Sequence, residues 1–224
     1  MWIKICGIRD VETALAVAGC GPDAIGLNFY SGSPRCVAPS LAAQIVAALP
    51  SGLEPVGVFV NASLAEVRET CQRCGLRSIQ LHGDEPPEMV AALRDYRVLR
   101  AFRVGDEGLS GVADYLEECR RLGGLPWRCL IDARVAGAYG GTGHTAPWDV
   151  LHAEYRRDDW PPLILAGGLR PENVSAAIRT VLPWGVDVAG GVESGVACKA
   201  IDLVRQFVES ARAADGGAAS RTGH

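Results

Sequence analysis

Short apolar runs alternate along the chain with longer stretches in which apolar residues recur three and four positions apart. The short runs predict eight β-strands, at residues 3–6, 24–29, 55–60, 78–81, 98–102, 129–132, 163–166 and 186–189. The longer stretches predict helices, most clearly at residues 41–49, 64–71, 89–93 and 174–178. Ser40 and Ser63 are candidate N-caps, and Pro87 and Pro171 suit first helical turns.

Eight strand/helix units in a chain of this length are typical of a (βα)8 barrel, the TIM barrel, or of an unusually long doubly wound sheet. The barrel is favoured because no Gly-x-Gly-x-x-Gly motif follows the first strand. We expect one domain over residues 1–212, since barrels of this size commonly form a single unit. Residues 213–224 are rich in Gly, Ala, Ser and charge and are predicted to form a disordered tail.

Composition narrows the class of partner. The chain has 224 residues, of which 48% are apolar and 21% charged, enough to bury a large core. The net charge of −4 comes from interleaved acidic and basic residues, which argues against nucleic acid or an anionic membrane and favours a small-molecule partner. No apolar run approaches the roughly 18 residues of a membrane span, and charged residues interrupt any signal-peptide core, so a cytoplasmic protein is expected.

The chain has eight cysteines, which sit inside apolar stretches. In a domain of this size they are expected to be small, mostly buried, reduced side chains rather than a disulfide framework. Cys71 and Cys74 form a Cys-x-x-Cys pair, which leaves open a non-catalytic metal-binding or interaction module. One such pair without a second is a weak signal for zinc.

Two ionisable residues stand where apolar strands end: Cys6 and Asp132. The strand ends of an α/β barrel are where a general base and a general acid would lie, so this pair points to proton transfer without a redox cofactor. A lone strand-end cysteine is more often structural than catalytic. If Cys6 faces the barrel interior, strand alternation places Lys4 there too, either paired with a structural carboxylate or lowering the thiol pKa.

Polar and glycine-rich positions near other strand ends are further candidates. Gln80 and His82 are two positions apart, so strand alternation points both side chains into the barrel, where they need hydrogen-bond partners or a ligand. For a histidine in such a place, a hydrogen-bonded role in the core is more common than ligand binding. The pairs Gly167-Gly168 and Gly190-Gly191 follow the last two strands, where barrels bind phosphate with backbone N–H groups. The segment at residues 139–145 lacks the ending of a Walker motif and is predicted to be a mobile loop beside Asp132.

From about residue 4 to residue 199 the chain resembles a known family, phosphoribosylanthranilate isomerase of tryptophan biosynthesis. The resemblance rests on motifs in the correct order, including Lys4-Ile-Cys-Gly7, Ser33-Pro-Arg35, Gln80-Leu-His-Gly-Asp-Glu85, Leu130-Ile-Asp132, Gly140-Gly-Thr-Gly143, Leu165-Ala-Gly-Gly-Leu169 and Gly185-Val-Asp-Val-Ala189. The chain departs from the family pattern at three places. Gly190 stands where serine is usual, Ala200 stands where an acidic residue is usual, and the usual Pro-Gly before Lys199 is missing. Asn28 is an unusual polar residue within the second strand.

The resemblance implies an Amadori rearrangement of N-(5′-phosphoribosyl)anthranilate to 1-(2-carboxyphenylamino)-1-deoxyribulose 5-phosphate. The resemblance implies that Cys6 corresponds to the general base of the family and Asp132 to its general acid. It also implies that Arg35 corresponds to the residue that holds the anthranilate carboxylate. His82 and Asp187 resemble supporting polar residues, and the two glycine pairs the phosphate site. No metal or cofactor is expected, and the protein is expected to be a monomer or a weak homodimer.

Other phosphosugar barrels are the alternative enzyme class. Indole-glycerol-phosphate synthase uses lysine and glutamate side chains at strand ends, and ribulose-phosphate epimerase uses metal-binding histidines with paired aspartates. Neither constellation is visible in this sequence. Metal analysis would separate these readings, because near-stoichiometric zinc or iron argues against a cofactor-free isomerase.

Overall fold

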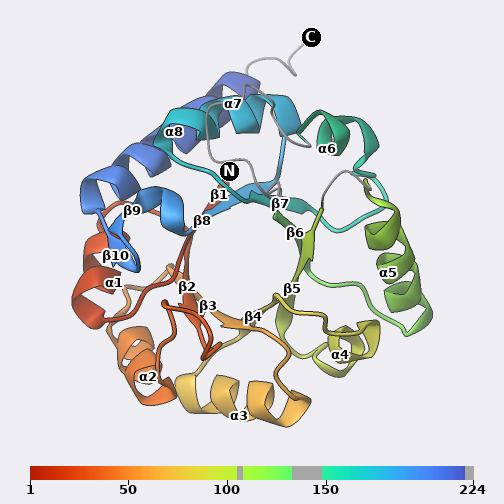
Figure 1. Cartoon of the computed structure of the whole chain (residues 1–224), viewed down its shortest axis with the longest axis horizontal. Coiled ribbons are helices and arrows are strands. Elements are labelled where there is room, and N and C mark those ends of the chain that lie inside the picture. Colours follow the sequence, from red (N-terminus) through yellow and green to blue (C-terminus); the bar gives the residue numbers. More distant parts are fainter. Residues whose placement is uncertain (105–107, 133–147, 220–224) are drawn as a thin grey trace.

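The computed structural model describes residues 1–104, 108–132 and 148–219, and it contains a closed barrel of eight parallel strands covered by helices (Figure 1). The barrel strands are β1 (Trp2–Cys6), β2 (Ala24–Asn28), β3 (Glu54–Phe59), β4 (Ser78–Leu81), β5 (Arg97–Arg103), β6 (Arg128–Asp132), β7 (Leu163–Ala166) and β8 (Gly185–Val188). β1 pairs with both β2 and β8, which closes the ring. The prediction of a (βα)8 barrel is confirmed, and the open doubly wound sheet is excluded.

Helices follow the strands on the outside of the barrel. They are α1 (Val11–Ala18), α2 (Pro39–Ala48), α3 (Leu64–Cys74), α4 (Pro87–Ala92), α5 (Ser110–Arg121), α6 (Trp148–Glu154), α7 (Pro171–Val181) and α8 (Ile201–Ala219). After β8 come a 3-10 turn, η1 (Gly190–Val192), and a small antiparallel pair, β9 (Glu193–Gly195) and β10 (Cys198–Lys199).

Local sequence signals explain where several helices start. Ser63 caps α3 in a full capping box with Glu66, as the sequence predicted. Pro87 and Pro171 occupy first turns. The cap predicted at Ser40 is wrong: α2 begins earlier, at Pro39, and Ala38 is its N-cap without a side-chain hydrogen bond. The fixed φ of a proline suits the first helical position, and here it outweighs the serine signal.

Strand alternation separates two hydrophobic clusters. Ile3 and Ile5 lie in the large cluster that also contains the buried faces of the helices. A smaller cluster inside the barrel consists of Ala24, Val56, Leu99, Ala101, Leu130, Ile164 and Ala166, with Trp2 and Trp127 packed against it. Lys4 is completely buried and pairs with Asp187. The predicted inward direction of Lys4 is therefore confirmed.

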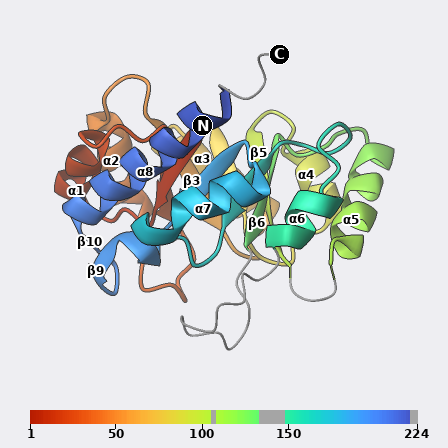
Figure 2. The ribbon, with the colours of Figure 1, turned by 90° about the horizontal axis from the view of Figure 1, so that it is seen from above.

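The C-terminal helix extends further than the sequence suggested. α8 runs to Ala219, beyond the predicted end of the barrel at residue 212, because Phe207, Ala211 and Ala214 continue one apolar face that packs in the core. Asp215 lies 2.5 Å from the N-terminal ammonium group. Figure 2 shows the N-terminus and the end of α8 together, opposite β9 and β10. Residues 220–224 of the predicted tail lie outside the described residues.

All eight cysteines are free thiols, and Cys71, Cys74, Cys119 and Cys129 are buried, whereas Cys198 is exposed. Despite the absence of an acidic residue at position 200, α8 starts at Ile201, with the Val204 N–H donating to the Ala200 carbonyl. Over the described ranges, no helix combines the length and apolarity that crossing a bilayer requires.

Candidate active site

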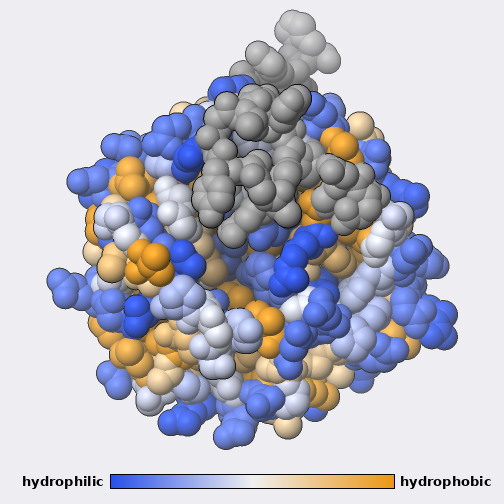
Figure 3. Space-filling model, viewed as in Figure 1, coloured by the Kyte–Doolittle hydropathy of each residue, from blue (hydrophilic) through white to orange (hydrophobic). Residues whose placement is uncertain are grey.

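A cavity of about 440 Å³ opens at the carboxyl ends of the barrel strands, and Figure 3 views the molecule from this end. All nine site residues singled out in the sequence line it: Cys6, Arg35, His82, Asp132, Gly167, Gly168, Asp187, Gly190 and Gly191. Asn28 also lines it. A larger cavity of about 800 Å³ lies at the opposite end, where strands begin. It is lined by exposed arginines together with Glu54 and Asp95, and no cysteine is among its lining residues. The smaller cavity therefore gathers the candidate chemistry.

Cys6 ends β1 and faces the interior across from β2. A Cβ atom on Gly26, its neighbour in β2, would lie 2.5 Å from the Cys6 sulfur, so glycine leaves the room that the thiol needs. Burial raises the pKa of the Cys6 thiol, and the nearby Lys4 charge opposes this rise. The site therefore holds a thiol whose ionisation depends on its cationic neighbour.

Lys4 is anchored directly below the cavity. Its Nζ atom donates to Asp187 Oδ1 at 2.8 Å, and the two side chains are 0% and 8% exposed. They are partners in the β1–β8 register, which fixes their approach through the backbone. The structure thus confirms that Lys4 pairs with a carboxylate. Its charge also acts to lower the pKa of Cys6, but burial outweighs it, and the pKa of the thiol stays above its ordinary value.

Asp132 ends β6 and carries an unsatisfied oxygen. Its Oδ1 atom is buried with no hydrogen-bond partner in the described part of the chain, and its Oδ2 atom lies 3.9 Å from His82 Nε2. Gln80 Nε2 lies 2.6 Å from His82 Nδ1. Burial lowers the pKa of His82 although Asp132 opposes the shift, so the ring favours its neutral form. An unpaired buried carboxyl oxygen at a cavity wall is suited to a hydroxyl or ring oxygen of a ligand.

The glycine pairs form one wall of the cavity. Gly167 and Gly168 follow β7, and Gly190 and Gly191 form η1 after β8. A Cβ atom on Gly191 would lie 1.8 Å from the Leu169 carbonyl oxygen, so only glycine permits these loops to meet. Backbone exposed in this way can bring N–H groups close to an anion. The predicted loop at residues 139–145 lies outside the described residues.

Arg35 reaches the cavity from the segment between β2 and α2. The Asn28 side-chain oxygen accepts from the Tyr30 N–H at 2.8 Å, and the Ser33 hydroxyl accepts from the Arg35 N–H at 3.1 Å. The Arg35 guanidinium binds both oxygens of Glu193, with Nε at 2.8 Å and Nη2 at 2.6 Å. One planar cation is thus held at the cavity edge, next to the second glycine pair, where a Cβ atom on Gly190 would lie 3.5 Å from Arg35 Nη2.

Comparison with known proteins identifies the group to which this arrangement belongs. Residues 3–210 match the family described as N-(5'phosphoribosyl)anthranilate (PRA) isomerase. The chain belongs to this family. It is 44% identical to the N-(5'-phosphoribosyl)anthranilate isomerase of Geobacter metallireducens, over 94% of this chain and 98% of that protein. It is 45% identical to that of Geobacter sulfurreducens, again over 94% and 98%.

Solved isomerase structures agree with the observed barrel. The crystal structure of phosphoribosyl anthranilate isomerase from Thermotoga maritima superposes with a TM-score of 0.83 at 34% identity, covering 95% of this chain and 99% of that one. A complex of such an isomerase with reduced 1-(o-carboxyphenylamino)-1-deoxyribulose 5-phosphate gives a TM-score of 0.81 at 32% identity, with 95% and 99% covered. The predicted isomerase of tryptophan biosynthesis is therefore confirmed at the level of the family.

The surroundings of the Cys71/Cys74 pair do not support the alternative prediction of a metal-binding module. Cys71 and Cys74 are buried in the core beside α2, and the Cys74 thiol donates to the Pro39 carbonyl at 3.3 Å. Within residues 1–104, 108–132 and 148–219, no three His, Cys, Asp or Glu side chains are grouped to hold a metal ion. These two cysteines act as small apolar side chains on the buried face of α3.

Two charged residues beside the candidate site, Glu193 and Lys199, were missed by sequence reasoning. Both have nearly fully buried side chains beside the second glycine pair. A usable signal existed, because an acidic residue two positions after a predicted phosphate loop is unfavourable unless a cation compensates it. That cation could not be named from the sequence.

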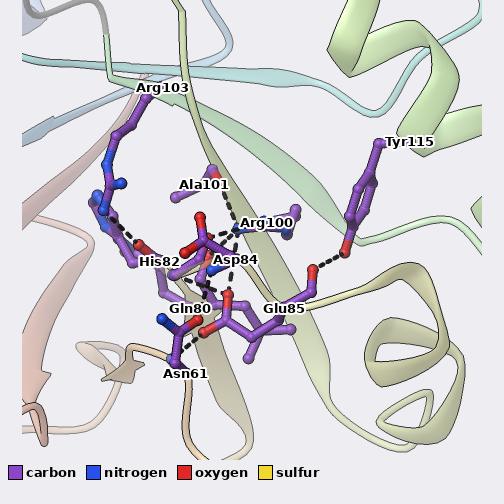
Figure 4. Close-up of polar contacts among 11 residues, drawn as sticks. Asn61, Gln80, His82, Asp84, Glu85, Arg100, Ala101, Arg103 and Tyr115 are labelled. Carbon is purple, nitrogen blue, oxygen red and sulfur yellow. Dashed lines mark hydrogen bonds and ion pairs between the residues drawn. The ribbon is translucent and has the colours of Figure 1, made fainter.

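A second buried network supports the loop that carries His82 (Figure 4). Arg100, on the outer face of β5, lies 3.4 Å from Glu85, and their side chains are 7% and 3% exposed. Glu85 accepts from the N–H groups of Asn61 and Gly83 at 2.8 and 2.9 Å. Arg100 also donates to the carbonyls of Leu81, Ala101 and Gly83. The network therefore fixes both sides of the loop from β4 to α4.

We expect Glu85→Gln to lower the free energy of unfolding by about 2 to 3 kcal/mol, because the amide leaves the buried Arg100 without a full counter-charge. Equilibrium urea unfolding measures this change. Glu118→Gln is the matched control, since Glu118 pairs with Arg121 on the exposed face of α5 and its loss should change little. Equal stability of the two variants would contradict a supporting role for the buried pair.

Proposed function

We propose that the protein isomerises N-(5′-phosphoribosyl)anthranilate with Cys6 as the general base and Asp132 as the general acid. The observation that carries this proposal is that a thiol from β1 and a carboxyl group from β6 line one cavity, next to a glycine wall suited to phosphate. The family assignment supplies the substrate. The two residues would act on different atoms of the sugar.

The reaction needs two proton transfers in sequence. Asp132 donates a proton to the ribose ring oxygen as the C1–O bond breaks, and the anthranilate nitrogen's electron pair forms the protonated Schiff base. Cys6 then removes the proton from C2, and those electrons neutralise the iminium to give an enolamine. Tautomerisation moves a proton to C1 and leaves the C2 ketone. The substrate nitrogen is the electron sink, so no cofactor is required, and each transfer contributes about 10²- to 10⁴-fold.

Lys4 would make Cys6 a competent base. A thiolate in a buried site needs a cation nearby, and the Lys4 ammonium is held in place by Asp187. The two charges of the Lys4–Asp187 pair act on the pKa of Cys6 in opposite directions, because Lys4 lowers it and Asp187 raises it. Asp187 therefore acts on the chemistry through Lys4, while His82 offers a neutral ring beside Asp132.

The substrate has two anionic ends, and the cavity offers two matching regions. Arg35 presents a planar fork suited to the anthranilate carboxylate. Gly167, Gly168, Gly190 and Gly191 offer backbone for the phosphate. A related isomerase was solved with a reduced, phosphorylated product analogue, which supports a small phosphorylated ligand here.

The direct test is the loss of fluorescence of freshly made phosphoribosylanthranilate in the presence of purified protein. We expect decay well above the spontaneous background, and we expect it to persist after dialysis against EDTA. Decay no faster than the background would overturn the assignment of substrate, and loss of activity after chelation would overturn the metal-free mechanism.

Arg35→Met is expected to raise KM with little change in kcat, because it removes a charge-assisted contact worth roughly 1.5 to 3 kcal/mol. The measurement is KM together with inhibition by a product analogue with and without the carboxylate. A surface arginine away from the cavity, Arg73 on α3, provides the control as Arg73→Met. Equal loss of affinity for both analogues would show that Arg35 does not bind that group.

The cellular setting of this function belongs to the proposal. Eight free thiols, several of them partly exposed, fit a reducing compartment, and we propose the cytoplasm. We further propose a monomer or a weak homodimer, a state that light scattering across a concentration series measures. A concentration-independent higher oligomer would contradict it.

A further inference from the structure

Three charged side chains, one partly exposed and two buried, meet at the edge of the cavity and are here called the Arg35–Glu193–Lys199 cluster. Glu193 Oε1 accepts from Arg35 Nε at 2.8 Å and from Lys199 Nζ at 2.7 Å, and Oε2 accepts from Arg35 Nη2 at 2.6 Å. The side chains of Glu193 and Lys199 are only 4% and 1% exposed. Burying charged groups is costly unless they are paired, and here the two buried side chains pair with each other and with the partly exposed Arg35.

The cluster joins two segments that are far apart in the sequence and that both line the cavity. Arg35 lies between β2 and α2, whereas Glu193 directly follows η1. Lys199 Nζ also donates to the carbonyl of Ala189, the residue before η1, at 2.9 Å. The Ala197 N–H donates to Glu193 Oε2 at 3.2 Å. The glycine turn and the arginine are therefore held by the same carboxylate.

The hydrogen bonds of Arg35 leave part of its fork available. An arginine has five N–H donors. Glu193 takes Nε and one Nη2 donor, and among the described residues no hydrogen bond from Nη1 is present. The open Nη1/Nη2 edge is the one that a planar carboxylate can bind in a bidentate manner.

The charges of the cluster leave an excess that suits an anion. Two cations share one carboxylate, so one positive charge remains beside the cavity. Burial alone would raise the pKa of Glu193, but the hydrogen bonds from Arg35 and Lys199 outweigh it and lower the pKa to about 2. Glu193 is thus ionised at neutral pH, and it orients Arg35 without cancelling the cluster's positive charge.

We propose that Glu193 is a positioning residue, which fixes the Arg35 guanidinium for the aryl carboxylate of the substrate and, through Lys199, ties it to the phosphate-binding turn. The inference rests on the proposed function for the identity of the ligand. A competing reading is that Glu193 occupies the place of the substrate carboxylate and must be displaced. The two readings predict opposite effects of removing its charge.

The first experiment compares Glu193→Gln and Glu193→Asp with the wild type in kcat, KM and affinity for two product analogues, one with and one without the carboxylate. Positioning predicts KM raised about tenfold with kcat within about twofold, and a loss of affinity confined to the carboxylate-bearing analogue. Tighter binding of that analogue would overturn the proposal in favour of displacement. Equal loss for both analogues would overturn it in favour of a general structural role. Glu117→Gln, in an exposed pair with Arg120 on α5, is the control.

The second experiment is a double-mutant cycle with Arg35→Met. If Glu193 acts through Arg35, the double variant Glu193→Gln/Arg35→Met should show the same preference between the two analogues as Arg35→Met alone. Independent, additive effects would overturn the proposal. Should Glu193→Gln fail to fold, Glu193→Asp carries the cycle, because it keeps the charge but is one methylene too short to reach both cations. Wild-type behaviour of Glu193→Asp would also overturn it.

Failure of the proposed function gives a different result. A wild-type protein that does not turn over phosphoribosylanthranilate would overturn the activity, whereas the analogue affinities still report on Glu193 and Arg35. An isomerase that is active, but whose carboxylate preference is unaffected by Glu193, would overturn only the positioning role.

Discussion

Cys6→Ser is expected to lower kcat by about 10²- to 10⁴-fold while leaving the fold intact, the loss typical of removing a general base. The hydroxyl fits the space that Gly26 leaves for the thiol. A hydroxyl is far less acidic than a thiol and so is a poor base near neutral pH, even beside Lys4.

The decisive measurement is the pH dependence of kcat/KM in both proteins. Burial raises the pKa of Cys6, so the fraction of thiolate, and with it the wild-type rate, should increase with pH below that pKa. The serine variant should lose this rise. Cys20→Ser, a partly buried thiol outside the cavity that donates to the Ala16 carbonyl, is the control and should keep both rate and profile. A wild-type rate in Cys6→Ser would remove the thiol from the mechanism.

Features that depend on neighbouring residues could be predicted from the sequence. The alternation of a strand has a period of two, so the inward direction of Lys4 followed from that of Cys6. Strands that end at a polar residue also predicted which side chains gather at one rim, because all strands of a parallel barrel end on the same side.

Features that depend on distant partners could not be predicted. Glu193 and Arg35 are 158 positions apart, and only barrel closure brings them together. Arg100 stands in an apolar strand with no sequence sign of Glu85 as its partner. The residues of the last turns of α8 are mostly small and polar and do not predict a packed helix. In the structure, however, Ala214 is buried, and Asp215 pairs with the N-terminal ammonium group at the other end of the chain. Each of these is a tertiary contact that overrides a local signal.

Asp132→Asn is expected to reduce kcat by a similar 10²- to 10⁴-fold, because the amide keeps the shape of the side chain but cannot transfer the proton to the ring oxygen. Binding of a reduced product analogue should change little, since Arg35 and the glycine wall are untouched. Stopped assays of kcat, together with calorimetric affinity for that analogue, separate chemistry from binding.

The position of Asp132 makes this variant a sharp test of the acid role. Its Oδ1 atom has no partner within the described residues, so an amide placed there breaks none of the hydrogen bonds that those residues make, and we expect little change in stability. Asp114→Asn, on the exposed face of α5, controls for the loss of one negative charge. If Asp132→Asn lost analogue affinity as much as kcat, Asp132 would be a binding residue. If it kept the wild-type rate, the proton for ring opening would have to come from another group at the rim, and His82, 3.9 Å away, would be the first to test.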